Sequence, residues 1–273
     1  MTVPSVLVFD SGLGGLTVFR EIVNARPDVS YIYVADDAFF PYGSHGEDGL
    51  IARVVPLFDQ LMAAHTPDLA VIACNTASTL VLPHLRARFA TPFVGTVPAI
   101  KPACSTSRSR LVSVLGTRAT VEREYTRALI RDFGQGCEVT LVGSANLATL
   151  AEAALHDRPV EDVTVAREIA PCFVETGVGG QTRRTDTVVL ACTHYPLLLD
   201  RLRRLAPWPV EWVDPAPAIA RRVVDLLGRQ LAAPGAPAGG ARAIFTSGMV
   251  PPPALAAALA RFGIGQAALR AAG

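Results

Sequence analysis

The sequence has no excess of charge of either sign and no long apolar run. Its 273 residues include 25 Lys or Arg and 24 Asp or Glu, which gives a formal net charge of +1. A balance of this kind offers no general surface for polyanions, so direct binding of nucleic acid is not expected. No apolar run approaches the roughly 18 residues of a membrane span. We therefore expect no membrane contact.

The N-terminus also lacks the features of a secretory signal. The segment MTVPSVLVFD has no basic beginning, and Asp10 interrupts its apolar run. The cysteines are odd in number and widely spread, at Cys74, Cys104, Cys137, Cys172 and Cys192. This pattern is typical of free thiols in a reducing compartment. We expect a cytoplasmic protein without disulfides.

The usual cofactor signatures are missing too. The glycines of DSGLGG do not spell G-x-G-x-x-G, because Thr17 stands where the third glycine would be, and no Walker lysine follows. Neither C-x-x-C nor HExxH spacing occurs, and no pyridoxal signature is evident. Residues of zinc-binding type do occur, at Asp10, Cys74, Cys192 and His194. Without a supporting spacing, we expect no metal and no cofactor.

Half of the chain is hydrophobic and 18% is charged, as in a compact globular protein. Short β-branched runs alternate with amphipathic stretches, which predicts an α/β protein with mainly parallel sheets flanked by helices. The predicted strands are 5–9, 30–34, 69–73, 93–96, 111–115, 138–142, 187–191, 210–213 and 243–246. An apolar stripe over 50–62 predicts a helix that Pro56 kinks or restarts.

One unit occurs twice. DLAVIACNTASTLVLPHLR (68–86) and DTVVLACTHYPLLLDRLRR (186–204) each run from an acid through a strand-like stretch to Ala-Cys, then into a Leu-rich helical pattern. The thiols Cys74 and Cys192 occupy equivalent places, which predicts two cysteines facing each other across one site. Two opposed groups that give or take a proton can invert a carbon centre. The alternative is a pair of buried structural thiols.

The repeat also predicts two similar domains. The Pro-rich segments VPAIKPA (97–103) and RLAPWPV (204–210) are candidate crossings between them. We expect a first domain of 1–97 plus 208–273 and a second domain of 98–207.

Polar motifs follow four of the predicted strands: DSGLGG, ACNT, GT at 116–117, and ACTH. Because ligands of parallel sheets bind beyond the carboxyl ends of the strands, one pocket could collect these motifs. They contain no Arg or Lys, so an acidic ligand would be held by amides, hydroxyls and helix N-termini. Asn75, Thr76 and Thr193 could equally be ordinary helix caps.

Three further features have possible chemical roles. Asp10 could take a thiol proton or orient a substrate ammonium, but as a carboxylate it would raise the pKa of a nearby thiol. His194, two residues after Cys192, would favour a thiolate there. The segment Pro41-Tyr42-Gly43 is either a simple turn or a carboxylate site made of backbone N–H groups and the Tyr42 hydroxyl.

Taken together, the motifs resemble those of the glutamate racemases in the cofactor-independent aspartate/glutamate racemase superfamily. The resemblance covers residues 5 to 262 and is carried by VFDSGLGGLTV (8–18), PYG (41–43), ACNTAS (73–78), LGTRATV (115–121) and ACTHYPLL (191–198). It implies two similar α/β domains with the active site at their interface.

The resemblance also implies roles for individual residues. Cys74 would take the α-proton of D-glutamate and Cys192 that of L-glutamate, with Asp10 and His194 as their respective partners. Glu152 falls where the family has a glutamate near the second thiol. The implied substrate contacts are Asp10, Ser11, Tyr42, Gly43, Asn75, Thr76, Thr117, Thr120, Thr193 and His194.

The expected function is therefore interconversion of L- and D-glutamate, which would supply D-glutamate for peptidoglycan synthesis. One alternative is a racemase of aspartate or another small acid. Another is a regulatory binding role, such as the restraint of a DNA topoisomerase reported for some relatives. A homodimer is among the assemblies that the resemblance allows.

Overall fold

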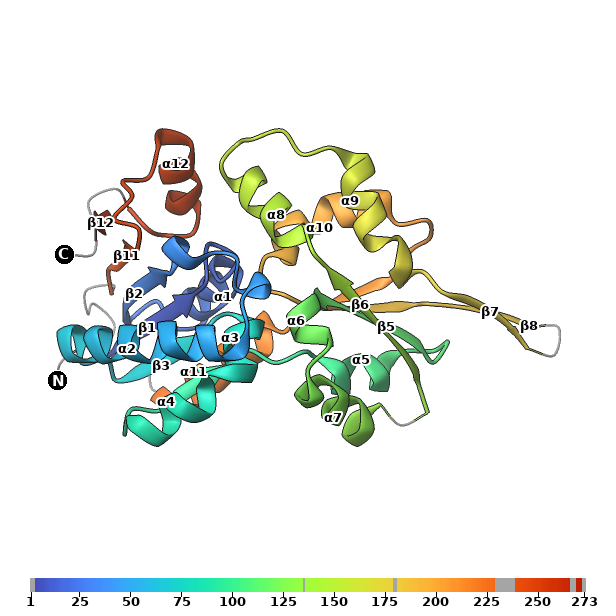
Figure 1. The fold of residues 1–273 in the computed structure, drawn as a ribbon, viewed down its shortest axis with the longest axis horizontal. Helices are drawn as coiled ribbons and strands as arrows, with labels where there is room; N and C mark the ends of the chain where they lie inside the picture. The colour runs from blue at the N-terminus through green and yellow to red at the C-terminus, as the bar shows by residue number, and fades with distance from the viewer. Residues whose placement is uncertain (1–2, 135, 179–180, 229–238, 266–268, 272–273) are drawn as a thin grey trace.

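Two parallel sheets, each flanked by helices, form two lobes that lie side by side along the long axis of the molecule (Figure 1). The computed structural model describes residues 3–134, 136–178, 181–228, 239–265 and 269–271. The predicted fold class, mainly parallel sheets flanked by helices in two similar halves, is confirmed.

The first sheet has six parallel strands. In spatial order they are β12 (Leu269–Ala271), β11 (Ala241–Phe245), β2 (Ser30–Ala35), β1 (Ser5–Asp10), β3 (Leu69–Ile72) and β4 (Phe93–Gly95). The helices of this lobe are α1 (Leu16–Ala25), α2 (Glu47–His65), α3 (Asn75–Leu80), α4 (Leu82–Arg88), α11 (Ala216–Leu227) and α12 (Pro253–Arg261).

The side chains of β1 point alternately to the two faces of the sheet, and each face packs against a different set of these helices. Val6 and Val8 belong to the core shared with α1, α11 and α12. Leu7 and Phe9 belong to the core shared with α2, α3 and α4. Because both faces are covered, the strand is apolar at consecutive positions, as is typical of parallel sheets. The polar end of the strand, Asp10, is therefore left at the edge facing the other lobe.

The second sheet has four parallel strands. They are β10 (Glu211–Val213), β9 (Thr187–Ala191), β5 (Leu111–Thr117) and β6 (Glu138–Ser144). Its helices are α5 (Ile100–Thr106), α6 (Arg118–Val121), α7 (Glu124–Phe133), α8 (Leu147–Leu155), α9 (Asp162–Ile169) and α10 (Leu199–Leu205). Helices α8, α9 and α10 contribute to one core, and α5 and α7 to the other.

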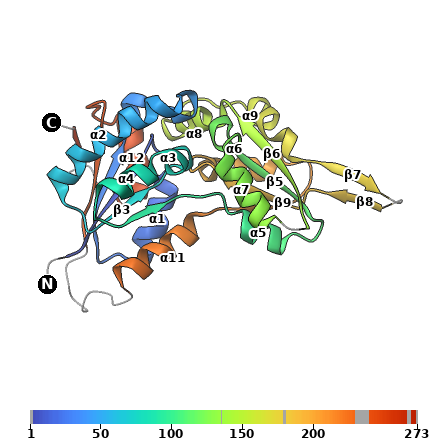
Figure 2. The same cartoon turned by 60° about the horizontal axis from the view of Figure 1, so that its bottom comes forward.

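The nine predicted strands all occur as strands. The patterns missed β12 and an antiparallel hairpin of β7 (Glu175–Val178) and β8 (Gln181–Arg184), which projects from the second lobe (Figure 2). These hairpin strands carry few apolar residues, so periodicity gave no signal for them. No helix in the described ranges has both the length and the apolar character that crossing a membrane requires.

Of the two effects expected at Pro56, a kink or a restart, the restart is wrong, because α2 runs as one helix from Glu47 to His65. Its buried side chains include Val54 and Phe58, on either side of the proline. Their packing against the sheet outweighs the one backbone hydrogen bond that the proline removes.

The return crossing lies later than the sequence suggested. Strand β10 pairs with β9 in the second sheet, although 208–273 was expected in the first domain. The chain rejoins the first lobe with α11, which packs in the same core as α1. We therefore propose that the second domain extends to about residue 213. The outward crossing lies between β4 and α5.

Gly15 tests the tight packing where β1 turns into α1. A Cβ there would come within 2.8 Å of the Asp10 Cβ and 2.9 Å of the Ala73 Cβ. We expect Gly15→Ala to lower the free energy of unfolding by about 1–3 kcal/mol through overpacking. Gly49→Ala is the matched control, because no atom lies within 4 Å of its added Cβ in the first turn of α2.

This control should be neutral or stabilising by up to about 1 kcal/mol, because alanine favours the helix. Urea unfolding of both variants measures the difference. Equal stabilities would show that the turn after β1 is not tightly packed.

Candidate active site

The two equivalent cysteines line one cavity where the lobes meet. Cys74 follows β3 of the first sheet and Cys192 follows β9 of the second, and each is 6% exposed. The cavity is lined by Ser11, Phe40, Pro41, Tyr42, Gly43, Cys74, Asn75, Thr76, Thr117, Ala148, Cys192, Thr193 and His194. Its free volume is small, about 20 Å³. Side chains of both lobes therefore pack closely around it.

Asp10 lies just behind this lining, at the end of β1. It is fully buried, and its Oδ2 accepts hydrogen bonds from the N–H groups of Gly12 (3.2 Å) and Gly15 (2.9 Å). Its Oδ1 has no hydrogen-bond partner. Burial raises the pKa of Asp10, although the nearby His194 opposes this shift. The free oxygen is suited to accept a proton or to bind a cationic group.

Cys74 lies in a setting that keeps it protonated. Its Sγ is 3.6 Å from the Ser11 Oγ. Burial and, second, the negative charge of Asp10 raise the pKa of the Cys74 thiol to about 12. The direction is the one that a neighbouring carboxylate predicts. Both effects favour the neutral thiol, the form that can donate a proton.

Cys192 lies at one end of a chain of polar contacts. The Nδ1 of His194 is 3.9 Å from the Cys192 Sγ, and its Nε2 is 2.8 Å from the Glu152 Oε1. The Leu13 N–H donates to the same carboxylate oxygen at 2.6 Å. Glu152 belongs to α8 and is linked to the second thiol through the imidazole of His194. The Gly14 N–H is placed to donate to the same Nε2, at 3.2 Å.

The charge of His194 follows from these contacts. Burial alone lowers the pKa of the imidazole, but the hydrogen bonds to Cys192 and Glu152 outweigh it and raise the pKa well above its ordinary value. The shift favours the imidazolium, whose Nε2–H would donate to Glu152, the shorter contact; the Gly14 N–H could then not donate to Nε2 as well. In that form His194 can stabilise negative charge on the second sulfur.

Threonine hydroxyls join the two lobes on the other side of the cavity. The Thr76 Oγ1 lies 3.2 Å from that of Thr117 and 3.3 Å from that of Thr120. Thr120 is not in the lining and instead supports the other two. Thr193 reaches the first lobe through its carbonyl, which accepts from the Thr17 hydroxyl at 3.1 Å. The hydroxyls of Thr76 and Thr117 therefore link the two lobes, and because both line the cavity they can donate hydrogen bonds to an anion.

Asn75 is the first residue of α3, yet its side chain caps nothing. The side chain is buried, and neither its amide nitrogen nor its amide oxygen has a hydrogen-bond partner. Burying a polar group without partners costs free energy. Because the amide lines the cavity, a bound polar molecule would satisfy it.

The structure corrects the expected role of the Tyr42 hydroxyl. It donates to the Asp36 Oδ2 at 2.6 Å and is therefore not free to hold a carboxylate. Asp36 also accepts from Arg53 Nε at 3.0 Å and the Thr246 hydroxyl at 2.6 Å. Tyr42 and Gly43 still line the cavity, with their backbone held by this network.

The sequence reasoning missed Asp36, Arg53 and Thr246. One available signal was that Asp36 directly follows the second strand, much as Asp10 ends the first. Phe40 was missed as well. Its ring lies 5.4 Å from the His194 ring, centroid to centroid, and covers the imidazole from the first lobe.

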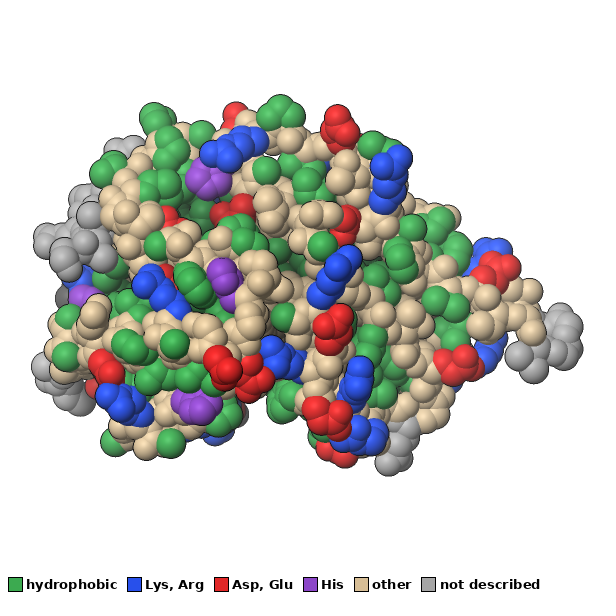
Figure 3. All heavy atoms as spheres, viewed as in Figure 1, with side chains coloured by type: hydrophobic (Ala, Val, Ile, Leu, Met, Phe, Trp, Pro, Cys, Tyr) green, Lys and Arg blue, Asp and Glu red, His purple; other side chains and the backbone are tan. Residues whose placement is uncertain are grey.

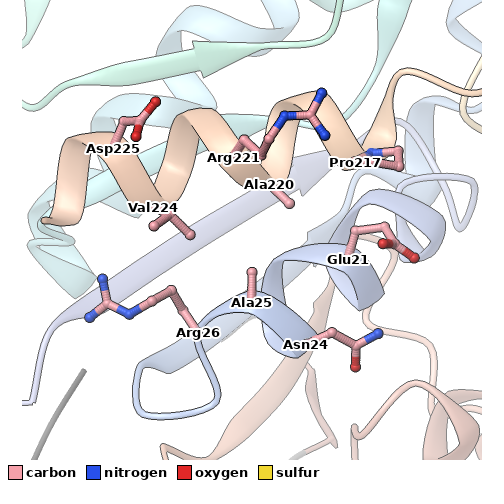
Figure 4. Close-up of a pocket in the computed structure, with 9 residues that line it drawn as sticks. All are labelled: Glu21, Asn24, Ala25, Arg26, Pro217, Ala220, Arg221, Val224 and Asp225. Carbon is pink, nitrogen blue, oxygen red and sulfur yellow. The ribbon is translucent and has the colours of Figure 1, made fainter. Parts of the chain in front are cut away.

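Other parts of the described chain offer no competing centre. No group of three or more His, Cys, Asp or Glu side chains arranged to hold a metal lies within it. A groove of about 650 Å³ runs along α1 and α11 (Figure 4), but none of the cavity-lining residues named above contributes to it. The face in Figure 3 carries charges of both signs along the junction of the lobes.

Tyr42→Phe tests the network around Asp36. Removing the hydroxyl leaves a buried carboxylate oxygen with one partner fewer, so we expect the free energy of unfolding to fall by about 1–3 kcal/mol. Tyr125→Phe is the control, because that side chain is 42% exposed. Guanidinium unfolding compares the two. Equal losses would mean that Asp36 does not depend on Tyr42.

The raised pKa of His194 predicts a pH-dependent contribution to stability. An unfolded histidine titrates near pH 6.5, so the folded protein holds this proton more tightly. The stabilisation is complete below that pH and is lost as the pH rises through the folded pKa, at up to about 1.4 kcal/mol per pH unit. The stability advantage of the wild type over His194→Gln should therefore shrink between pH 6 and 9.

Urea unfolding at several pH values measures this advantage. His84→Gln, at an exposed position on α4, is the control and should show no such trend. An advantage of His194 that stays constant with pH would contradict the assignment of an imidazolium.

Comparison with known proteins agrees with this geometry. The sequence profile of the Asp/Glu/Hydantoin racemase family matches residues 10–223. The glutamate racemase of Brucella anthropi is 58% identical over 223 residues, which are 81% of this chain and 79% of that protein.

Solved structures give the same result. The Escherichia coli glutamate racemase, solved with L-glutamate and the activator UDP-MurNAc-Ala, is 40% identical with a TM-score of 0.85, covering 99% of this chain and 98% of that one. The Thermus thermophilus enzyme, solved with β-chloro-D-alanine, is 27% identical with a TM-score of 0.71, covering 99% and 97%. The chain therefore belongs to the Asp/Glu/Hydantoin racemase family and, within it, to the glutamate racemases.

Proposed function

We propose that this enzyme interconverts L- and D-glutamate by proton transfer between the substrate α-carbon and two cysteines. The observation that carries the proposal is the origin of the two sulfurs. Cys74 and Cys192 end equivalent strands of two different sheets, and both line one buried cavity. A stereocentre placed between them has one sulfur on each face, so a proton removed from one side is replaced from the other.

The unsatisfied polar groups fit an amino acid. Asp10 Oδ1 is an anionic acceptor without a partner, suited to an α-ammonium group. The Asn75 amide and the hydroxyls of Thr76 and Thr117 can hold carboxylate oxygens. The Escherichia coli relative was solved with L-glutamate, which supports the same ligand class here.

The two thiols are set differently before the reaction. Cys192 has a cation, His194, at hydrogen-bonding distance, whereas Cys74 has the carboxylate of Asp10. These neighbours suit Cys192 to act as the base and Cys74 as the acid toward the enantiomer that presents its α-proton to Cys192, which by resemblance is L-glutamate.

The reverse direction needs a thiolate at Cys74. The substrate ammonium favours this thiolate, because a positive charge placed between Asp10 and Cys74 offsets the carboxylate and lowers the pKa of the thiol. Asp10 can also accept the thiol proton directly. The carbanion that forms is enolate-like, and fixed N–H and hydroxyl donors around the α-carboxylate stabilise its added charge.

The small cavity favours a cycle in which the lobes open for substrate binding. In that cycle the contacts across the junction would break and re-form at each turnover. These contacts include the threonine hydroxyls and the Leu13–Glu152 hydrogen bond. Closure then excludes water and strengthens the electrostatic contacts on the substrate.

The product would be D-glutamate for peptidoglycan synthesis in a bacterial cytoplasm. Racemisation of aspartate is the alternative, since both substrates present an ammonium and two carboxylates. They differ by one methylene, which places the side-chain carboxylate at a different depth in the cavity. Assays with both acids separate the two proposals.

Cys74→Ser and Cys192→Ser test the two-base scheme. We expect each to lower glutamate racemisation by at least about a thousandfold, because the pKa of a serine hydroxyl is far above that of a thiol: the hydroxyl is a poor proton donor, and its alkoxide is not available as a base. In D2O, neither variant should give inverted product from either enantiomer. Cys74→Ser should still remove the α-proton of a β-substituted L-analogue and release its β-substituent, since Cys192 remains; Cys192→Ser should do so only with the D-analogue.

Cys137→Ser is the control, because that thiol lies outside the cavity. It should racemise like the wild type. Near wild-type racemisation by either single active-site variant would refute the two-base scheme. Turnover of aspartate but not glutamate by the wild type would replace the proposed substrate.

A further inference from the structure

A second cavity lies next to the catalytic one. It has a volume of about 250 Å³ and lies between the Pro41-Tyr42-Gly43 turn, the end of β5 and the segment joining β6 to α8. Pro41, Gly43, Thr117 and Ala148 line both cavities. The larger space is therefore separated from the site that holds the thiols by these shared residues alone.

Arg118 is the charged side chain in the lining of this second cavity. It begins α6 and directly follows Thr117 at the end of β5. A Cβ added to Gly143 would lie only 3.1 Å from the Arg118 Cα and 3.2 Å from its Cγ. A glycine in the neighbouring strand thus leaves room for the arginine stem beside β6. The backbone around Arg118 is consequently well fixed relative to the cavity.

The positive charge of Arg118 is not offset by an ion pair. Within the described residues, no carboxylate lies within 4.0 Å of its guanidinium, whereas nearby Arg123 is paired with Glu47 at 2.7 Å and Arg53 with Asp36. The catalytic cavity itself is lined by no Lys or Arg. Arg118 is therefore a free cation at the mouth of a site whose interior holds anions by amides and hydroxyls.

We propose that this second cavity is the entrance vestibule of the active site and that Arg118 is a specificity-determining residue that attracts the side-chain carboxylate of an acidic amino acid. The inference rests on the proposed function and adds a selection step to it. An acidic amino acid carries a net negative charge, whereas a neutral one carries none. An exposed cation acts over about 8–10 Å at moderate ionic strength, so it raises the local concentration of the charged substrate.

The position of Arg118 predicts which kinetic parameter it controls. It is exposed and contributes to the vestibule but not to the lining around the thiols. Its charge should therefore act on capture of the substrate and not on proton transfer. Loss of the charge should therefore lower kcat/KM by raising KM, and this effect should weaken as salt screens the charge.

Arg118→Gln, Arg118→Lys and Arg127→Gln test the vestibule. Arg127→Gln removes the same charge from an exposed position on α7 that lines neither cavity, so it is the matched control. Initial rates of L-glutamate racemisation are measured from about 10 mM to about 500 mM ionic strength, a range over which the screening length falls from roughly 30 Å to a few ångströms.

At the lowest ionic strength we expect Arg118→Gln to lower kcat/KM about three- to tenfold with kcat nearly unchanged. The deficit should disappear at the highest ionic strength. Arg118→Lys should keep most of the wild-type value and its salt dependence, and Arg127→Gln should match the wild type. Arg118→Met, which keeps an apolar stem, replaces the glutamine variant should that one fail to fold in a thermal melt.

Two results would overturn the inference. One is an Arg118→Gln enzyme that matches Arg127→Gln at every ionic strength. The other is a loss in kcat that is the same at all salt concentrations, which would indicate a structural role. Both need a wild type that racemises glutamate. A wild type inert on glutamate would instead refute the proposed function, and the vestibule inference with it.

Discussion

The hydrogen bond between Glu152 and the Leu13 N–H is the contact on which the geometry of the site depends. Its carboxylate, on α8 of the second lobe, accepts from the turn after β1 of the first lobe and contacts the His194 imidazole with the same oxygen. One group therefore links the two lobes and, after Cys192, helps to raise the pKa of the His194 imidazole. Opening the lobes would remove the Leu13 N–H from Glu152, so we expect domain motion and the proton state of His194 to be coupled through this carboxylate.

The two halves of the repeated unit differ in the groups that surround their thiols. The sequence repeats place Cys74 and Cys192 at equivalent strand ends, and the sheets reproduce that equivalence. Their neighbours are not equivalent, because Asp10 comes from β1 and His194 from the segment just after Cys192 itself. A carboxylate keeps one sulfur protonated, and a cation can stabilise negative charge on the other. The asymmetry suits a two-base reaction, which at rest needs one acid and one base and not two of either.

Strands and thiols were predictable because they depend on local pattern. Consecutive apolar residues mark buried parallel strands, and the Ala-Cys repeat places both sulfurs at the same edge of their sheets. Contacts between distant side chains were not predictable: nothing near Tyr42 indicates that its hydroxyl would meet Asp36 instead of the cavity. The same limit explains Pro56, where tertiary packing overrides a local rule, and β10, whose sheet is decided by which strand it meets beyond the crossing.

The remaining constraint is the presence of buried polar atoms without partners in the site. Asp10 Oδ1 and both polar atoms of the Asn75 amide are buried without partners, and an apolar residue in place of either would avoid that cost. The fold retains these groups at the junction of the lobes, where a ligand with one cationic and two anionic groups would satisfy all three atoms. A substrate that supplies those partners would therefore stabilise the arrangement in which the two lobes meet around it.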